Sequence, residues 1–350
     1  MPTTTPSPTK LKIPEIPESA FINAAKNFLN SKPHGKILPV HEPYSEKFDT
    51  SNWNEIDQHV SETLVDGLPE NEYKLFTNSG EEKHFMTASY MKHRSVSSSA
   101  SSSTSSSNSL TSIYYDLFNN DKFRQKWNKK LIQADMIQQG APGVESNNNA
   151  TGDYSSSCLD NKKIQPNFGP YPGSPSNPNL YYEVEKGNSM SPDKDRIVLS
   201  GHIFYKFKKD PSDQNEKEKI MMVVISYSDD EEIASVAELR DEYRKRSHGT
   251  SSGDADESKK TKKQSVYYLV QIIAESDQPN TIDIYQASVM KMPVNIWDWI
   301  TNKLVKKIVS LVNGNIFKVA DGLVDGSDDS YKSSGIFEKL KRESIKCVSL

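Results

Sequence analysis

The segment PVNIWDWITNKLVKKIVSLVNGNIFKVADGLV, residues 293–324, has the longest regular apolar pattern in the chain. Its apolar residues recur at spacings of three and four, which is typical of an amphipathic helix. One stripe contains Trp297, Ile300, Leu304, Ile308 and Leu311, and a second stripe beside it contains Val305, Val309, Val312, Ile316, Val319 and Leu323. The segment predicts a long helix with a broad apolar face, and its lysines and asparagines are too frequent for a bilayer-spanning segment.

A helix with so broad an apolar face needs a broad partner, and the strand-like segments before it supply one. Alternating or β-branched patterns occupy residues 73–76, 84–93, 181–185, 195–208, 219–227, 264–275 and 281–292. Turns and polar inserts separate these segments, with few helices between them, which favours an antiparallel sheet. The sequence therefore predicts an α+β fold in which a curved antiparallel β-sheet wraps around the long C-terminal α-helix.

Composition predicts one folded domain that is diluted by polar inserts. The apolar fraction is 34%, and 43 basic residues stand against 47 acidic ones, so we expect no general nucleic-acid binding. Two more helices are predicted, one at residues 20–30 that is capped by Ser19 and one near residues 51–64. We predict disordered residues at 1–17, a domain at 18–325 with low-complexity inserts near 95–109, 140–179 and 247–263, and a flexible basic tail at 326–350.

Catalytic and metal-binding signatures do not emerge from the sequence. The seven histidines show no metal-ligand spacing, and there is no GxSxG motif, P-loop or dinucleotide fingerprint. We therefore predict a protein without enzymatic activity, catalytic residues, metal or cofactor. Two alternatives stay open, a protein-interaction scaffold with a filled core and an enzyme that uses buried polar residues. Candidates for the latter are Arg196, Tyr205, Tyr267 and Tyr268.

Two segments resemble the START-like, helix-grip superfamily of lipid-binding domains. In LFNNDKFRQKWNKKLIQADMI, residues 117–137, a helix, a break at Asp121, the pair Trp127-Asn128 and an apolar strand follow one another as in that superfamily. Near the C-terminus, the strand at 281–292 runs through Pro293 into the long helix in the same way. Asp195-Arg196 is a reversed form of a START pair, and Arg94-Ser95 resembles a pair in a fungal START-like family of unknown function.

The resemblance implies that the sheet and the C-terminal helix enclose a site for a lipid, a sterol or another apolar ligand, and that the protein binds or transfers this ligand without catalysis. Such sites bind through buried apolar area, and a few polar groups set the orientation of the ligand. The predicted ligand-binding residues are Trp297, Ile300, Leu304, Ile308, Leu311 and Arg196. For each apolar residue among them, ordinary core packing is the alternative.

The C-terminal segment KLKRESIKCVSL places Cys347 at the prenylated position of a C-a-a-X pattern. Leu350 at the last position favours a geranylgeranyl group, whereas Ser349 departs from the aliphatic residue that the pattern prefers. Lys339, Lys341, Arg342 and Lys346 could add attraction to anionic lipid headgroups. We expect a cytoplasmic protein that contacts a cytosolic membrane face through this tail, the alternative being a plain disordered tail.

Overall fold

A computed structural model of the protein describes 14 separate stretches of the chain. These are residues 16–31, 53–79, 84–95, 110–119, 121–137, 173–175, 178–187, 193–208, 216–228, 262–263, 267–278, 280–291, 298–324 and 345–347. Residues 1–15 of the predicted N-terminal tail, nearly all of the three predicted inserts and most of the basic tail lie outside the described residues. Ile16, which was predicted to belong to that tail, is buried in the core.

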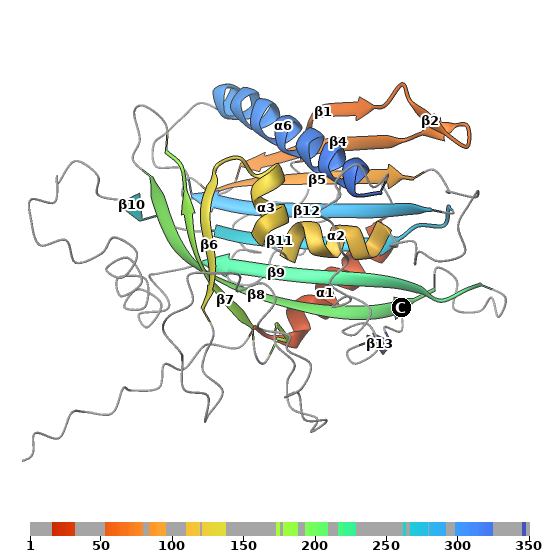
Figure 1. Ribbon diagram of the computed structural model, residues 1–350, viewed down its shortest axis with the longest axis horizontal. Coiled ribbons are helices and arrows are strands. Elements are labelled where there is room, and N and C mark those ends of the chain that lie inside the picture. Colours follow the sequence, from red (N-terminus) through yellow and green to blue (C-terminus); the bar gives the residue numbers. More distant parts are fainter. Residues whose placement is uncertain are drawn as a thin grey trace, which may run out of the picture.

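An 11-stranded curved sheet forms the body of the protein (Figure 1). Its hydrogen-bonded path runs β1-β4-β5-β12-β11-β9-β8-β7-β6, with every neighbouring pair antiparallel. The strands are β1 (Asn54–Val60), β4 (Asn71–Ser79), β5 (His84–Arg94), β6 (Leu131–Ile137), β7 (Asn179–Glu185), β8 (Lys194–Phe207), β9 (Lys219–Ser228), β11 (Tyr267–Glu275) and β12 (Thr281–Lys291). Each strand-like segment predicted from the sequence lies within or overlaps one of these strands, so the predicted antiparallel sheet is confirmed.

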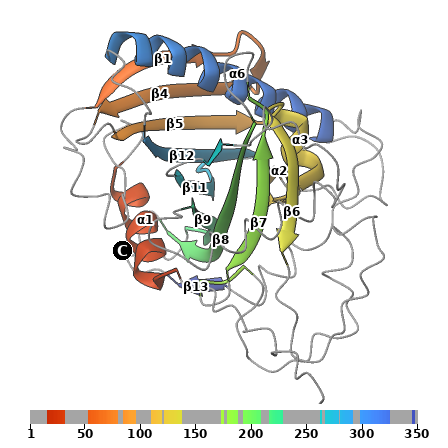
Figure 2. The same cartoon turned by 90° about the vertical axis from the view of Figure 1, so that its left-hand side faces the viewer.

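Helices cover both faces of the sheet (Figure 2). Helix α1 (Glu18–Ser31) packs on one face, called here the α1 face, mainly over β9 and β11. Helices α2 (Leu110–Asn119), α3 (Asp121–Trp127) and α6 (Asp298–Val324) pack on the other, called here the helix face. The long C-terminal helix therefore lies along a curved antiparallel sheet, which is the predicted helix-grip arrangement.

The approach of α1 to the sheet explains a glycine in the middle of β8. A Cβ atom at Gly201 would come within 3.1 Å of both Ile16 Cδ1 and Phe21 Cζ. Ile16 and Phe21 are buried against Ile203, Tyr205 and their neighbours on β9 and β11. The absence of a side chain at Gly201 thus allows α1 to sit directly on β8.

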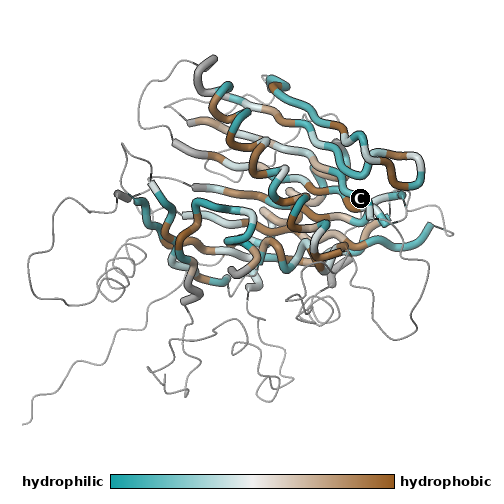
Figure 3. Tube along the Cα trace, turned by 45° about the horizontal axis from the view of Figure 1, so that its top comes forward, coloured by the Kyte–Doolittle hydropathy of each residue, from teal (hydrophilic) through white to brown (hydrophobic). Residues whose placement is uncertain are grey.

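Helix α6 confirms the predicted C-terminal helix, but the side of the helix that faces the sheet differs from the prediction. The buried face carries the second stripe, including Val305, Ile316 and Leu323, whereas Leu304, Ile308 and Leu311 are 47%, 42% and 65% exposed. In Figure 3, hydrophobic and hydrophilic residues follow one another along the turns of α6, as expected for a helix with one buried and one exposed side. Both stripes are apolar in sequence, and the contacts of α6 with the sheet distinguish them. Asn302 receives a hydrogen bond from Thr77 on β4, and Ser310 donates one to Asp57 on β1.

The predicted helix at residues 51–64 is wrong, because Asn54–Val60 form β1 instead. Trp53, Ile56, Val60 and Leu64 recur at helical spacing, but the residues between them leave little apolar surface to bury. The free edge of β4 offers backbone hydrogen-bond partners to the whole segment, and β1 occupies it. Beyond β1, Asp66 and Gly67 both have positive φ and turn the chain between β2 (Leu64–Val65) and β3 (Leu68–Pro69).

Two short strands extend β8 at its sides. β10 (Lys262–Lys263) pairs in parallel with Lys194 and Asp195, and β13 (Ile345–Cys347) pairs in parallel with residues Phe204–Lys206. Three residues of the predicted flexible tail therefore return to the sheet, where β8 extends beyond the end of β7. Lys262–Lys263 likewise belong to a predicted insert but contact the sheet.

Candidate ligand site on the helix face of the sheet

The side chains on the helix face of the sheet are apolar near one end of the strands and largely polar further along them. At the end near α2, one row of directly paired residues crosses the sheet and is entirely apolar. This row, called here the apolar row, consists of Tyr73, Met91, Ile284, Ile273, Met222 and Phe204. All of its members belong to one buried cluster with α2, α3 and the C-terminal half of α6.

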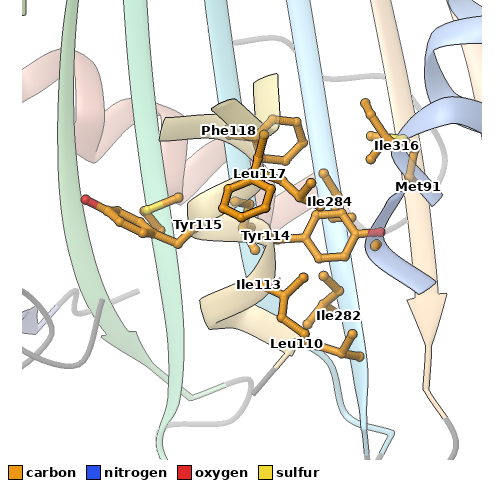
Figure 4. Packing of buried hydrophobic residues seen from close by; sticks show 14 of the residues in the cluster. Met91, Leu110, Ile113, Tyr114, Tyr115, Leu117, Phe118, Ile282, Ile284 and Ile316 are labelled. Atoms are coloured by element: carbon orange, nitrogen blue, oxygen red, sulfur yellow. The ribbon is translucent and has the colours of Figure 1, made fainter. Parts of the chain in front are cut away.

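Helices fill the space above the apolar row. In Figure 4, Tyr114 of α2 points toward Met91 and Ile316, whereas Tyr115 points the other way, toward the strands around β9. Trp127 of α3 packs edge-on against Phe118, with a centroid distance of 5.8 Å, and donates a hydrogen bond to the Leu117 carbonyl. Aromatic side chains thus pack this end of the helix face as ordinary core.

The next row along the strands, called here the amide row, is largely polar. It lies about 7 Å from the apolar row, because the two are separated by two residues along each strand. The amide row consists of Leu75, Ser89, Gln286, Gln271, Val224 and His202. Ser89, Gln271 and His202 are buried, so this polarity is inside the protein.

A third row, called here the hydroxyl row, follows at the same spacing. It consists of Thr77, Thr87, Ser288, Leu269, Ser226 and Ser200. Two of its cross-strand pairs are hydrogen-bonded hydroxyls, Thr87 with Ser288 at 2.8 Å and Ser226 with Ser200 at 2.8 Å. Thr77 donates to Asn302 Oδ1 of α6 at 2.9 Å, which ties the row to the N-terminal half of the helix.

The opposite face of the same strands shows that this polarity is specific to the helix face. Directly between the amide and hydroxyl rows, but on the α1 face, the paired residues are Phe76, Ala88, Ala287, Val270, Ile225 and Gly201. These residues join the buried cluster beneath α1, apart from the glycine on which α1 sits. The strands thus bury one apolar face and one polar face at the same level.

Three polar atoms in this region are buried without a hydrogen-bond partner among the described residues: Gln286 Oε1, Ser228 Oγ and Asn313 Nδ2. Gln286 is in the amide row, Ser228 follows Ser226 on β9, and Asn313 belongs to the buried side of α6, where it is 1% exposed. A buried polar group without a partner costs about 1–3 kcal/mol. These atoms therefore point to a ligand or to water that completes their hydrogen bonds.

The two polar rows carry no formal charge at neutral pH. They contain no Lys, Arg, Asp or Glu, and burial lowers the pKa of His202 to about 4. His202 packs edge-on against Tyr115 at 6.0 Å and Phe204 at 5.7 Å, an aromatic setting that disfavours the imidazolium. What the rows offer is a set of neutral donors and acceptors.

Arg196, a predicted ligand-binding residue, is held in an ion-pair network. Its guanidinium donates to Glu183 at 2.7 Å and to Glu185 at 2.9 Å, and Arg124 of α3 pairs with Glu183 at 2.5 Å. Burial alone would raise the pKa of Glu183, but the two arginines lower it to about 2. The ion pairs of Arg196 thus join β8 to β7, and Arg124 adds α3 to the same network.

A second polar link connects α6 to α2 through β5. His93 lies between Tyr114 and Asp321, with Nδ1 2.8 Å from the Tyr114 hydroxyl and Nε2 2.8 Å from Asp321 Oδ1. Its ring also packs against Phe317 at 5.7 Å. This link fixes the C-terminal end of α6 at the apolar end of the sheet, and Val305 fixes the N-terminal half on Leu75 and Phe85.

The other predicted site residues are not brought together. Leu304, Ile308 and Leu311 lie on the exposed side of α6, Trp297 lies outside the described residues, and of Ile300 only the backbone is described. Of the three tyrosines considered for an enzyme, Tyr205 and Tyr268 face α1, and of Tyr267 only the backbone is described. Sequence reasoning missed the polar rows, although a signal was present: serine and glutamine at alternate positions of strands that are otherwise apolar on both faces.

No protein-family model matches the chain, and no curated protein matches it. Among solved structures, human STARD10 is similar with 8% identity over 84% of this chain and 86% of that chain, at a TM-score of 0.41. Human StAR-related lipid transfer protein 5 is similar with 7% identity over 78% of this chain and 88% of that chain, at a TM-score of 0.37. A STAR-related lipid transfer protein fragment from Xanthomonas axonopodis is similar with 8% identity over 78% of this chain and 98% of that chain, at a TM-score of 0.35. At these scores the assignment of a helix-grip fold rests on the chain's own strand order and C-terminal helix.

Proposed function

We propose that the protein binds a lipid on the helix face of its sheet, beneath the N-terminal half of α6, and that it acts as a non-enzymatic lipid carrier. The observation that carries this proposal is the pair of polar rows, because most of their polar residues are buried on the helix face while the α1 face at the same level is apolar. Lipid sites combine apolar walls with a few polar groups that fix orientation. The apolar row and the polar rows provide both within about 14 Å along the strands.

The position of the proposed site differs from the prediction in one respect. The prediction used the Trp297–Leu311 stripe of α6 as the wall of the site, whereas Val305 and Val309 are the α6 residues that pack with the sheet residues Leu75 and Phe85. The apolar end of the helix face is filled by α2 and α3. The amide and hydroxyl rows are therefore the part of the sheet on which a ligand is proposed to lie.

Native mass spectrometry and lipid extraction of the purified full-length protein test this function. We expect co-purifying lipid in stoichiometric amounts and transfer of that lipid class between vesicles. Protein that is folded by circular dichroism, carries no lipid and transfers none would refute the lipid-carrier proposal and favour the interaction scaffold.

We also propose that α6 meets the membrane surface during lipid exchange. Its exposed side carries Leu304, Ile308 and Leu311, and exposed Lys303 and Lys307 flank this stripe. Apolar residues beside lysines favour an anionic membrane surface, since each basic residue near such a surface contributes about 1 kcal/mol. No helix among the described residues is long and apolar enough to cross a membrane.

Geranylgeranylation of Cys347 is proposed as a second membrane signal on a cytosolic membrane face. Support comes from the C-a-a-X position of Cys347 and the basic residues before it. Cys347 pairs through its backbone with Lys206 of β8, so β13 has to leave the sheet for a prenyltransferase to bind the segment as a free peptide. Intact mass of protein purified from the membrane fraction of its native cells tests the modification, and an unmodified Cys347 there would contradict it.

A further inference from the structure

We infer that the bound lipid carries an uncharged polar group with a hydroxyl, and that Asn313 of α6 and Gln286 of β12 hold this hydroxyl from opposite sides. The inference deepens the lipid-carrier function and rests on it. The ligand class is lipids with a free hydroxyl, such as sterols, diacylglycerols or ceramides. Lipids with an ionic headgroup in the site are excluded from this class.

The contacts of α6 on either side place Asn313 above the middle of β5. Earlier in the helix, Val305 and Val309 pack with Phe85 and Leu75. Later in the helix, Phe317 and Asp321 meet His93. Asn313 lies between these two contact points on the buried side of the helix, and therefore above the stretch of β5 that contains Ser89.

Gln286 is the direct neighbour of Ser89 in the sheet. Ser89 pairs with Gln286 of β12, which in turn pairs with Gln271 of β11. All three side chains point to the helix face, because Met91 and Ile284, two residues away on the same strands, pack with α2 and α6. The Asn313 amide thus lies over one end of the amide row and the Gln286 amide lies within it.

The two amides present complementary atoms without partners among the described residues. Asn313 Nδ2 is a buried donor and Gln286 Oε1 is a buried acceptor. A hydroxyl accepts one hydrogen bond and donates another, so one such group satisfies both atoms. A phosphate or carboxylate would accept from Asn313 but would bring negative charge against the Gln286 oxygen, which also carries a partial negative charge.

The charges around the site also disfavour an ionic headgroup. Charged groups described elsewhere on the helix face have partners, among them Arg196 with Glu183, Asp57 with Lys306, and Asp321 with the His93 ring. Moving an unpaired phosphate into such a site would leave it desolvated without a counterion, which is far more costly than burying a hydroxyl.

The test compares matched lipids on the full-length protein. The probes are a fluorescent sterol with a free hydroxyl, the methyl ether of the same sterol, a fluorescent diacylglycerol and a fluorescent phosphatidic acid. We expect the sterol or the diacylglycerol to bind at least about tenfold more tightly than phosphatidic acid. If the sterol binds, its methyl ether should bind about tenfold more weakly, which corresponds to the loss of one hydrogen bond.

Substitutions test whether Gln286 and Asn313 are the residues that bind the hydroxyl. Gln286→Leu and Asn313→Leu are each expected to weaken binding of the hydroxyl lipid about tenfold and to abolish its preference over the methyl ether or over phosphatidic acid. Gln58→Leu makes the same change at an exposed position of β1 and should leave binding unchanged. Circular dichroism checks that each variant is folded, and we expect the fold to persist because each replaced amide has a buried atom without a partner among the described residues.

The outcomes separate this inference from the proposed function. Folded wild-type protein that binds none of the four probes and carries no native lipid would refute lipid binding itself. Protein that binds lipid but prefers phosphatidic acid, or binds sterol and methyl ether equally, or keeps its preference in both leucine variants, would overturn the hydroxyl assignment and leave the lipid-carrier function standing.

Discussion

The two ends of the helix face are built from the same strands and yet serve different purposes. At the α2 end, the apolar row packs against aromatic residues and closes a core. At the other end, the amide and hydroxyl rows carry serines, threonines and glutamines, most of them buried, while the α1 face behind them stays apolar. The strands tolerate apolar residues at this level, so strand propensity does not explain the polar rows. Residues that reduce stability without a structural reason are expected at functional sites.

Removing Arg196 should have the largest effect on stability. Arg196→Ala removes one of the two arginines that pair with the buried Glu183 and leaves Arg124, and breaking such a buried pair destabilises a protein by up to about 3–5 kcal/mol. Urea unfolding measures the loss. Lys206→Ala removes an exposed partner of Glu218 and serves as the control, with a change below about 1 kcal/mol.

The same variant decides whether Arg196 has the ligand role predicted from the sequence. Because Arg196 binds Glu183 and Glu185, the folded fraction of Arg196→Ala should bind lipid as the wild type does. Normal stability together with lost lipid binding would instead return Arg196 to the ligand site.

Truncation in the apolar row should cost nearly as much. Ile284→Ala opens a cavity beneath α2 and should destabilise the protein by about 2–5 kcal/mol. Ser89→Ala, on the neighbouring strand but in the amide row, removes a hydroxyl and little packing, so its effect should stay below about 1 kcal/mol. Equal losses for the two variants would show that both ends of the helix face are ordinary core.

Acid should destabilise the protein in two pH windows. Burial lowers the pKa of His202 from 6.5 to about 4, so between these pH values the unfolded chain binds more protons than the folded protein. The free energy of unfolding therefore falls as the pH drops from about 6.5 to 4, by at most about 3 kcal/mol. The pKa of Glu183 is lowered from 4.5 to about 2, and its contribution is present above pH 4.5 and is lost as pH falls toward 2.

His202→Phe separates these windows. The phenyl ring keeps the packing against Tyr115 and Phe204, and the slope of stability between pH 6.5 and 4 should decrease while the loss below pH 4.5 persists. Denaturant unfolding at several pH values measures both slopes. An unchanged slope in the upper window would mean that His202 does not titrate there.

The smallest stability effect is expected on the exposed side of α6. Leu311 is 65% exposed, so Leu311→Gln should change the free energy of unfolding by no more than about 0.5 kcal/mol. The same change should weaken co-sedimentation with anionic vesicles, and Val305→Gln, on the buried side, should mainly destabilise the fold. Unchanged vesicle binding by Leu311→Gln would remove α6 from the proposed membrane contact.

Periodicity predicted the elements of this fold well because it reports burial directly. The alternation of Phe85, Thr87, Ser89 and Met91 predicted a strand, and the broad pattern at 293–324 predicted α6. Which side of a two-stripe helix faces the sheet depends on tertiary contacts, such as those of Asn302 with Thr77 and of Val305 with Leu75, that periodicity does not contain. The polar rows depend on the register of strands far apart in the chain, so Ser89, Gln286 and Gln271 meet only after folding.

The central claim, that the polar rows form a ligand site and not a structural core, is tested most directly by Gln271→Leu. Gln271 is buried in the amide row between Gln286 and Val224. Lipid binding and urea unfolding of this variant and of the wild type, both measured on delipidated protein, give the answer. We predict stability equal to or above that of the wild type and binding of the native lipid weakened about tenfold. Unimpaired lipid binding with a stability loss of several kcal/mol would contradict the claim.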